Sequence, residues 1–169
     1  ISVAGLLLAT LGLIGMAHAI KTAGLIALAC SMFVTGMGTA LPWGLMDGLA
    51  VSAVSVERAG MAAGLFNTVR VAGEGMALAI VMALPALFNR LGLQQNLPTL
   101  DTATRDKAAV WLSGSHVLQA HELLPQIPVP LLISNVEQAY FILLYGLAAI
   151  TLGCAVWVGI LLKQPVKQA

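Results

Sequence analysis

The sequence has few charged residues, and this lack excludes most classes of protein. Asp, Glu, Lys and Arg make up 9% of the 169 residues, against about 25% in an ordinary soluble domain. The formal net charge is only +1, so the chain lacks the basic surface that nucleic-acid binding requires. The two cysteines, Cys30 and Cys154, both lie in apolar stretches, where we expect neither a disulfide framework nor a zinc site.

What the sequence has instead is apolar residues. They make up 59% of the chain, and the mean hydropathy is +0.94. This composition predicts an integral membrane protein. The chain opens at Ile1 inside an apolar stretch, with no initiator Met and no basic segment, which is unlike a signal peptide. We therefore expect the chain to be the C-terminal part of a longer, multi-pass membrane protein.

The lengths of the apolar stretches predict an all-α, polytopic helical fold. A helix that spans a bilayer needs about 20 mostly apolar residues. Four stretches meet this requirement, at residues 3–20, 23–51, 59–88 and 136–162. The connections are then a very short turn at Lys21, a polar segment at residues 52–58 and a long loop at residues 89–135, and residues 163–169 form a tail.

The long loop contains signals for short helices of its own. Residues 101–113 have a helix-forming composition, and Gly114 is placed to end that helix. Ser115 could cap a second short helix that ends near Leu124. We expect Trp111 to anchor these helices at the boundary between membrane and water.

The end of the long loop predicts a late start for the last helix. Pro125, Pro128 and Pro130 disfavour a helix and favour extended backbone. Ser134 and Glu137 then form the pattern of a capping box just before an apolar run. We therefore expect the last helix to begin near residue 136.

The distribution of basic residues gives a weak indication of orientation. Lys163 and Lys167 lie in the tail, and Arg58 lies in the 52–58 connection. Cytoplasmic segments are enriched in such residues, so we place both segments in the cytoplasm. Lys21 and the long loop then face outward.

Small residues recur at four-residue spacing on the second and third helices. This spacing places them on one helix face, where they allow another helix to approach closely. One interpretation is simple packing; the other is a sliding contact in a transporter, close to the proline at position 42. The predicted packing positions are Gly36, Ala40, Gly44, Gly48, Gly60 and Gly64, together with Gly73 further along the third helix.

Charged residues inside the third helix are the strongest functional signal. Arg70 and Glu74 are four residues apart and can pair on one face, with Asn67 one turn before Arg70. Arg70 lies about 16 Å along the helix, where an isolated charge costs roughly 2.5–3.5 kcal/mol. These groups therefore form either a structural pair or a polar site on a substrate or proton pathway.

Asp47 is a weaker candidate for the same pathway. It lies about 36 Å along the second helix, near its cytoplasmic end. It is therefore either a solvated residue at a helix end or a residue with a gating or coupling role. His116, His121 and Glu122 do not have the spacing of a helical zinc motif, so we expect no metal site.

Two segments of the sequence resemble the major facilitator superfamily. One is Gly36-Met37-Gly38-Thr39-Ala40-Leu41-Pro42, and the other is the run VERAGMAAGLFNTVR at residues 56–70, followed by Gly73. They are most similar to the fourteen-helix drug:proton antiporter branch, in which a short cytoplasmic E-R-x-G-like turn precedes an N-x-x-R-x-x-G helix. A long outward loop before the last helix is also typical of that branch.

This resemblance implies a function for the chain. It implies the last four helices of a proton-coupled multidrug efflux antiporter in a bacterial inner membrane, with a small-molecule substrate and protons as partners. The missing N-terminal helices would carry the signature motif and the main proton-coupling acids. No enzymatic activity, cofactor or nucleic acid is implied. Glu74 departs from the family pattern, in which a small residue would follow Gly73, and this favours a pair with Arg70.

Three other functions remain open on the sequence alone. The first is a transporter of the same fold for another solute, such as a sugar, an organic acid or a peptide. The second is an intramembrane enzyme that uses Glu74, Arg70 and Asp47, although no nucleophile or metal set accompanies these residues. The third is a helical scaffold subunit.

Overall fold

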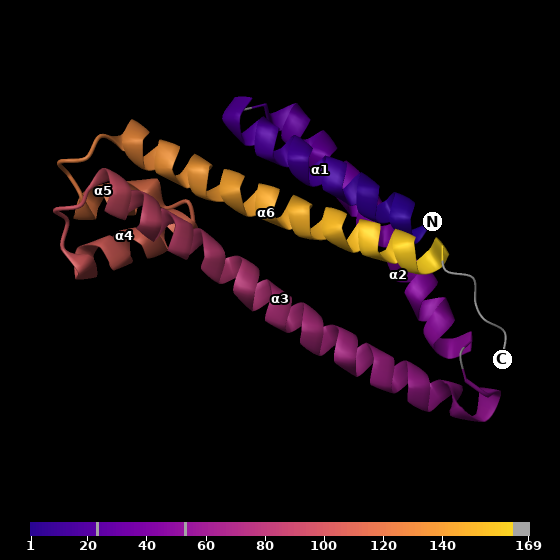
Figure 1. Ribbon diagram of the computed structural model, residues 1–169. Coiled ribbons are helices and arrows are strands. Elements are labelled where there is room, and N and C mark those ends of the chain that lie inside the picture. The colour runs from indigo at the N-terminus through magenta and orange to yellow at the C-terminus, as the bar shows by residue number, and fades with distance from the viewer. Residues whose placement is uncertain (23, 53, 164–169) are drawn as a thin grey trace. The chain divides into compact units, whose positions relative to one another are not determined.

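The described part of the chain is almost entirely helical. The computed structural model describes residues 1–22, 24–52 and 54–163, leaving out the side chains at positions 47, 49–51, 162 and 163. No strand occurs in these residues, so the predicted all-α fold is confirmed for them. The elements are α1 (Ser2–Thr22), α2 (Leu25–Ser52), a 3₁₀ turn η1 (Val56–Arg58), α3 (Ala59–Asn96), α4 (Thr102–Ser113), α5 (Val117–Leu123) and α6 (Val129–Lys163) (Figure 1).

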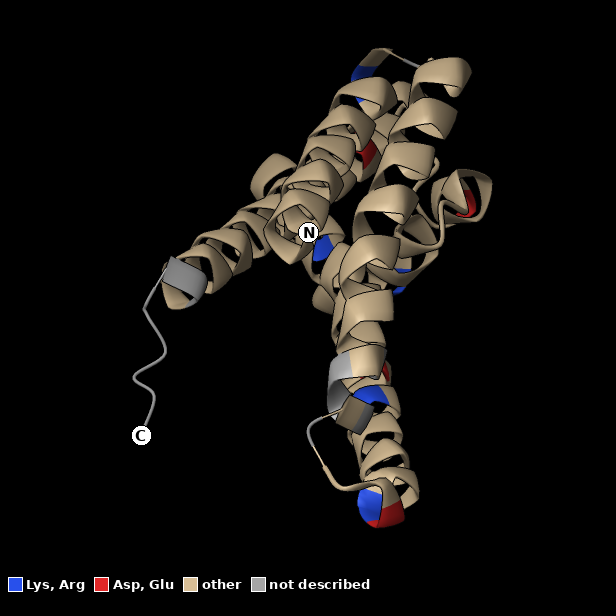
Figure 2. Ribbon diagram, turned by 90° about the vertical axis from the view of Figure 1, so that its right-hand side faces the viewer, with Lys and Arg blue, Asp and Glu red and all other residues tan. Residues whose placement is uncertain are grey.

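Four of these helices, α1, α2, α3 and α6, are long and apolar enough to cross a bilayer, which marks the protein as membrane-embedded. Figure 2 shows how sparsely Lys, Arg, Asp and Glu are distributed along their ribbons. Helix α3 has 38 residues and is therefore about 57 Å long, well beyond a hydrocarbon core of about 30 Å.

The two helices that flank the long loop extend further than the sequence predicted. Helix α3 continues to Asn96, past the predicted end at residue 88. Helix α6 begins at Val129, and Ser134 lies inside it. The prediction that Ser134 caps the start of this helix is therefore wrong. The physical reason is the position of Pro130 in the first turn, where a helix needs no N–H donor. The carbonyl of Pro128 accepts the first helical hydrogen bond, from the Leu131 N–H at 3.0 Å.

The short helices of the long loop form nearly as predicted. Helix α4 begins after Asp101, whose carboxylate accepts hydrogen bonds from the N–H groups of Ala103 and Thr104, and it ends at Gly114. Helix α5 is preceded by His116 instead of Ser115, so Ser115 is not its cap. Ser115 has a φ of 61° and forms the turn between the two helices.

The first compact unit comprises residues 1–72 and those from 144 onward. In it, α1 and α2 lie against each other at glycine contacts. A Cβ added at Gly38 would overlap the backbone N of Ala9, and one at Gly5 would lie 2.7 Å from the carbonyl oxygen of Gly38. A Cβ at Gly12 would overlap the Thr35 hydroxyl. The backbones of the two helices therefore approach as closely as glycine allows.

The second compact unit comprises residues 73–143 and has a hydrophobic core of its own. The Tyr140 hydroxyl on α6 donates to the Ser113 carbonyl at 2.7 Å, which ties α6 to the end of α4. Arg90 on α3 forms a half-exposed ion pair with Asp106 on α4, at 2.8 Å. The buried core residues are Leu93, Ala108, Ala109, Leu112, Ala120, Leu124, Ile127 and Leu132.

Candidate functional site

The intramembrane arginine predicted from the sequence lies against a tryptophan of the neighbouring helix. The Cζ atom of Arg70 on α3 is 4.8 Å from the centre of the Trp43 ring on α2. This is within the range of about 6 Å in which a guanidinium is attracted to the ring face. Arg70 is partly buried, and Trp43 is 51% exposed. The site is therefore a cation–π contact between two membrane helices.

The chain connection explains why these two residues meet. Trp43 lies about two and a half helical turns before the end of α2 at Ser52, and Arg70 lies about three turns after the start of α3 at Ala59. The 3₁₀ turn η1 lies in the short connection between the two helices. Residues at similar distances from such a connection lie at similar depths. The hairpin thus places an aromatic face at the depth of the charge.

Electrostatics explain what the contact does for the charge. A guanidinium at the centre of a bilayer costs roughly 2.5–3.5 kcal/mol on insertion scales. A cation–π contact stabilises it by about 0.5–1 kcal/mol when exposed and by about 2 kcal/mol when water is excluded. The Trp43 ring therefore offsets part of the cost of Arg70 and leaves its charge in place.

The other predicted pathway residues stay predictions. Asn67 and Glu74 are exposed in the described chain, on α3 on either side of Arg70 along the helix. The pairing of Arg70 with Glu74 remains an expectation from their spacing. The side chain of Asp47 lies outside the described part of the structure.

The predicted small-residue faces do not carry the α1–α2 contact. That contact uses Gly38, which lies two residues from Gly36 and therefore on a different side of α2. Ala40 is exposed, and a packing role for the predicted faces stays a prediction. Open space surrounds the Cβ position of the predicted glycines, which are Gly36, Gly44, Gly48, Gly60, Gly64 and Gly73.

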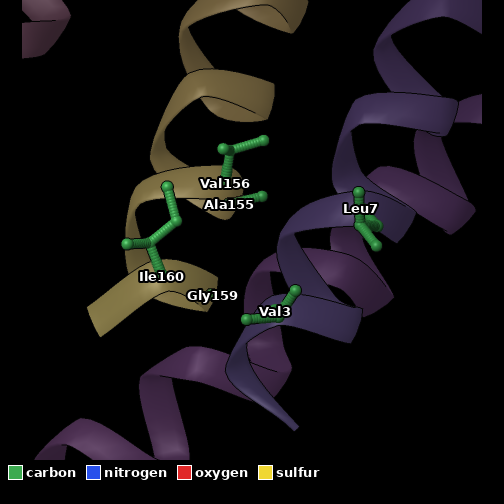
Figure 3. Close-up of a pocket in the computed structure, with 6 residues that line it drawn as sticks. All are labelled: Val3, Leu7, Ala155, Val156, Gly159 and Ile160. Atoms are coloured by element: carbon green, nitrogen blue, oxygen red, sulfur yellow. The ribbon is translucent and has the colours of Figure 1, made fainter. Parts of the chain in front are cut away.

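An apolar cavity of about 360 Å³ lies in the first unit. Val3 and Leu7 line it from α1, as Figure 3 shows, and four residues from the end of α6 line it from the other side: Ala155, Val156, Gly159 and Ile160. No lining side chain carries a polar group. The cavity therefore has no side-chain hydrogen-bonding group that could orient a ligand.

The second unit contains a buried amide pair that the sequence analysis did not single out. The Nδ2 group of Asn135 on α6 donates to Oδ1 of Asn89 on α3 at 2.9 Å and to its backbone carbonyl at 3.2 Å. The Nδ2 group of Asn89 donates to the Pro85 carbonyl at 2.9 Å. Both side chains are nearly inaccessible to solvent, at 0% and 5% exposure. The two asparagines themselves were the available signal, and nothing in their spacing along the chain indicated that they pair.

The histidines of the loop make structural contacts. The His116 ring lies edge-on to Trp111, with the ring centres 5.8 Å apart. The Nδ1 atom of His121 is 3.0 Å from the Ile127 carbonyl. Within the described residues, no three His, Cys, Asp or Glu side chains come together as a metal site would require.

Comparisons with known proteins give no relative for this chain. No protein-family model matches it, and no curated protein or solved structure matches it significantly.

Proposed function

We propose that the chain forms part of a secondary transporter of the major facilitator type, namely a proton-coupled antiporter that exports lipophilic or cationic compounds. The observation that carries this proposal is Arg70, a charge inside an apolar helix that is held against Trp43. Intramembrane charge is costly and is used mainly on substrate and ion pathways. The resemblance of residues 36–73 to the drug:proton antiporters supports the same function.

In this proposal, Arg70 and Glu74 have different roles on one face of α3. Arg70 supplies a fixed positive charge, and Trp43 holds it at a defined depth. Glu74, one turn further along, supplies a carboxyl group that can exchange a proton with the pathway. Proton exchange beside a fixed charge would couple proton entry to rocking of the helical bundle.

The test is transport by the full-length protein in liposomes. With a proton gradient imposed, we expect accumulation of cationic dyes that stops when an ionophore collapses the gradient. Trp43→Leu should reduce the transport rate, because Arg70 loses its ring. The matched control is Trp157→Leu, which removes an exposed tryptophan of α6 and should leave the rate unchanged.

Two results would contradict the proposal. One is dye accumulation that does not depend on the proton gradient. The other is uptake of a sugar, an organic acid or a peptide with no dye transport, which would assign the chain to a transporter of another solute.

A further inference from the structure

Both ends of the long loop join one hydrophobic core in the unit of residues 73–143. Residues of α3, α4, α5 and α6 all contribute to this core, where α4 and α5 lie beside the adjoining ends of α3 and α6 (Figure 1). Leu93 of α3 is 2% exposed, and Leu112 of α4 and Leu132 of α6 are fully buried. We refer to this core, together with the Asn89–Asn135 pair, as the loop clamp.

Within the loop clamp, α3 and α6 are in direct contact. The buried residues of α3 are Pro85, Asn89 and Leu93, whose four-residue spacing places them on one helix face. Asn135 on α6 donates two hydrogen bonds to Asn89. The side-chain oxygen of Asn135 lies so close to Gly92 that a Cβ at this position would overlap it. The absence of a side chain at Gly92 therefore allows α6 to approach α3 closely.

Helix α4 is bound to both of the long helices. Arg90 of α3 forms its ion pair with Asp106 of α4 at 2.8 Å. Tyr140 of α6 donates to the carbonyl of Ser113, the last residue of α4, at 2.7 Å. Separation of α3 from α6 would therefore break contacts to α4 as well as the contacts between the two long helices.

Opening the loop clamp would expose groups that the fold buries completely. Asn89 is 0% exposed, and its side-chain oxygen and nitrogen both form hydrogen bonds. Leu112, Leu124 and Leu132 are also inaccessible to solvent. Opening would therefore remove hydrogen bonds from a buried amide pair and expose apolar area at the same time. Packed contacts of this kind move as rigid bodies or come apart, because a close-packed core does not deform gradually.

We propose that the loop clamp holds the adjoining ends of α3 and α6 together as one rigid body throughout the transport cycle. Alternating access in secondary transporters is largely rigid-body movement of one group of helices against another. Helix ends that stay fixed to each other belong to the same moving group, so the pathway does not open between them. The transport cycle in this proposal rests on the proposed function, whereas the rigidity of the loop clamp can be measured without transport.

A disulfide between α3 and α6 tests whether the helix ends separate. A Cβ at Gly92 would lie 3.0 Å from the Cγ of Asn135, which is one bond from the Cβ of that residue. The two Cβ positions are therefore at most about 4.5 Å apart, within reach of a disulfide. Gly92→Cys and Asn135→Cys are introduced together into the full-length protein. Its native cysteines, Cys30 and Cys154 among them, are first replaced by Ala.

The disulfide should form on oxidation and should not stop transport. We expect the rate of dye transport to stay within about twofold of the rate of the reduced protein, because atoms that never separate add no barrier when they are bonded. The matched controls are the two single-cysteine variants, which cannot form the bond and which report any damage by the oxidant. A larger fall that only the double variant shows, and that a reductant reverses, would overturn the proposal. Failure of the bond to form would also overturn it, because the helix ends would then not be in contact.

A spectroscopic measurement tests the loop clamp even if the protein transports no dye. Spin labels are attached to Gln94→Cys on α3 and Ser134→Cys on α6, at two exposed positions. Their dipolar spectrum should show one narrow distance that is the same at acidic and neutral pH, with and without dye. A broad or changed distance would overturn the proposal. Absence of transport together with one unchanged distance would contradict the proposed function and support the loop clamp.

Discussion

The contact between α1 and α2 allows a quantitative prediction from a single methyl group. In Gly38→Ala, the new Cβ would overlap the backbone N of Ala9 and lie 2.7 Å from the carbonyl oxygen of Gly5. Both are backbone atoms of a helix, so they cannot rotate aside, and the helices must separate. Overpacking of this kind costs about 1–3 kcal/mol.

Gly38→Ala also has a stabilising effect, because alanine favours the helical conformation more than glycine does, and a second variant measures this effect alone. Replacing glycine by alanine within a helix stabilises it by about 0.5–1 kcal/mol. Gly36→Ala gains this term on the same helix, where open space surrounds the new methyl group. We therefore expect Gly36→Ala to be neutral or slightly stabilising. The free energies of unfolding of the two variants should then differ by about 1–3 kcal/mol.

The assay is reversible unfolding of the purified protein in mixed detergent micelles, followed by circular dichroism as sodium dodecyl sulfate is added. Ala9→Gly should not rescue Gly38→Ala, because the overlapping atoms of Ala9 are its N and Cα. The reasoning would be refuted if both alanine variants unfolded at the same detergent fraction, or if Ala9→Gly restored stability.

Three further substitutions test other parts of the structure. Asn135→Leu should cost about 1–3 kcal/mol in the same unfolding assay, because it leaves the buried Oδ1 of Asn89 without this donor, and the double change of both residues to Leu should recover part of the loss. Asp101→Ala removes the hydrogen-bond acceptor at the start of α4 and should destabilise that helix by about 0.5–2 kcal/mol. Amide hydrogen exchange in the first turn of α4 should then be faster, and unchanged exchange would contradict the capping role. Glu74→Gln should lower folded yield, because it removes the negative charge expected to pair with Arg70 within an apolar helix, and adding Arg70→Gln should recover yield but not transport. A yield unaffected by Glu74→Gln would argue against the pair.

Sequence patterns were sufficient for the parts of the fold that depend on local chemistry. The length of each apolar run indicated the four long helices, and Asp101 with Gly114 marked the limits of α4. The start of α6 was missed because two features of the same segment conflicted. Ser134 resembled the N-cap of a helix, but Pro130 fits the first turn of a helix that begins earlier. The proline that was predicted to prevent a helix therefore lies at the start of one.

The contacts between helices were harder to predict, for a geometric reason. Two residues of helix correspond to a rotation of about 200°, so Gly36 and Gly38 lie on different sides of α2. In a soluble helix, the polar face indicates which side is outside, but here nearly every side is apolar. The same ambiguity concealed Trp43 as the neighbour of Arg70. The spacing of the charges predicted Glu74 as a partner, and nothing in the sequence indicated an aromatic ring on α2.

The glycine contact between α1 and α2 also determines the entropy of their association. Gly5, Gly38 and Ala9 have no side-chain rotamers, so bringing the helices together orders no side-chain torsion at these positions. The close link between the end of α1 at Thr22 and the start of α2 at Leu25 already restricts how far the two helices can separate. The cost in conformational entropy at these positions is therefore small, which leaves less for the dispersion attraction between the two backbones to offset.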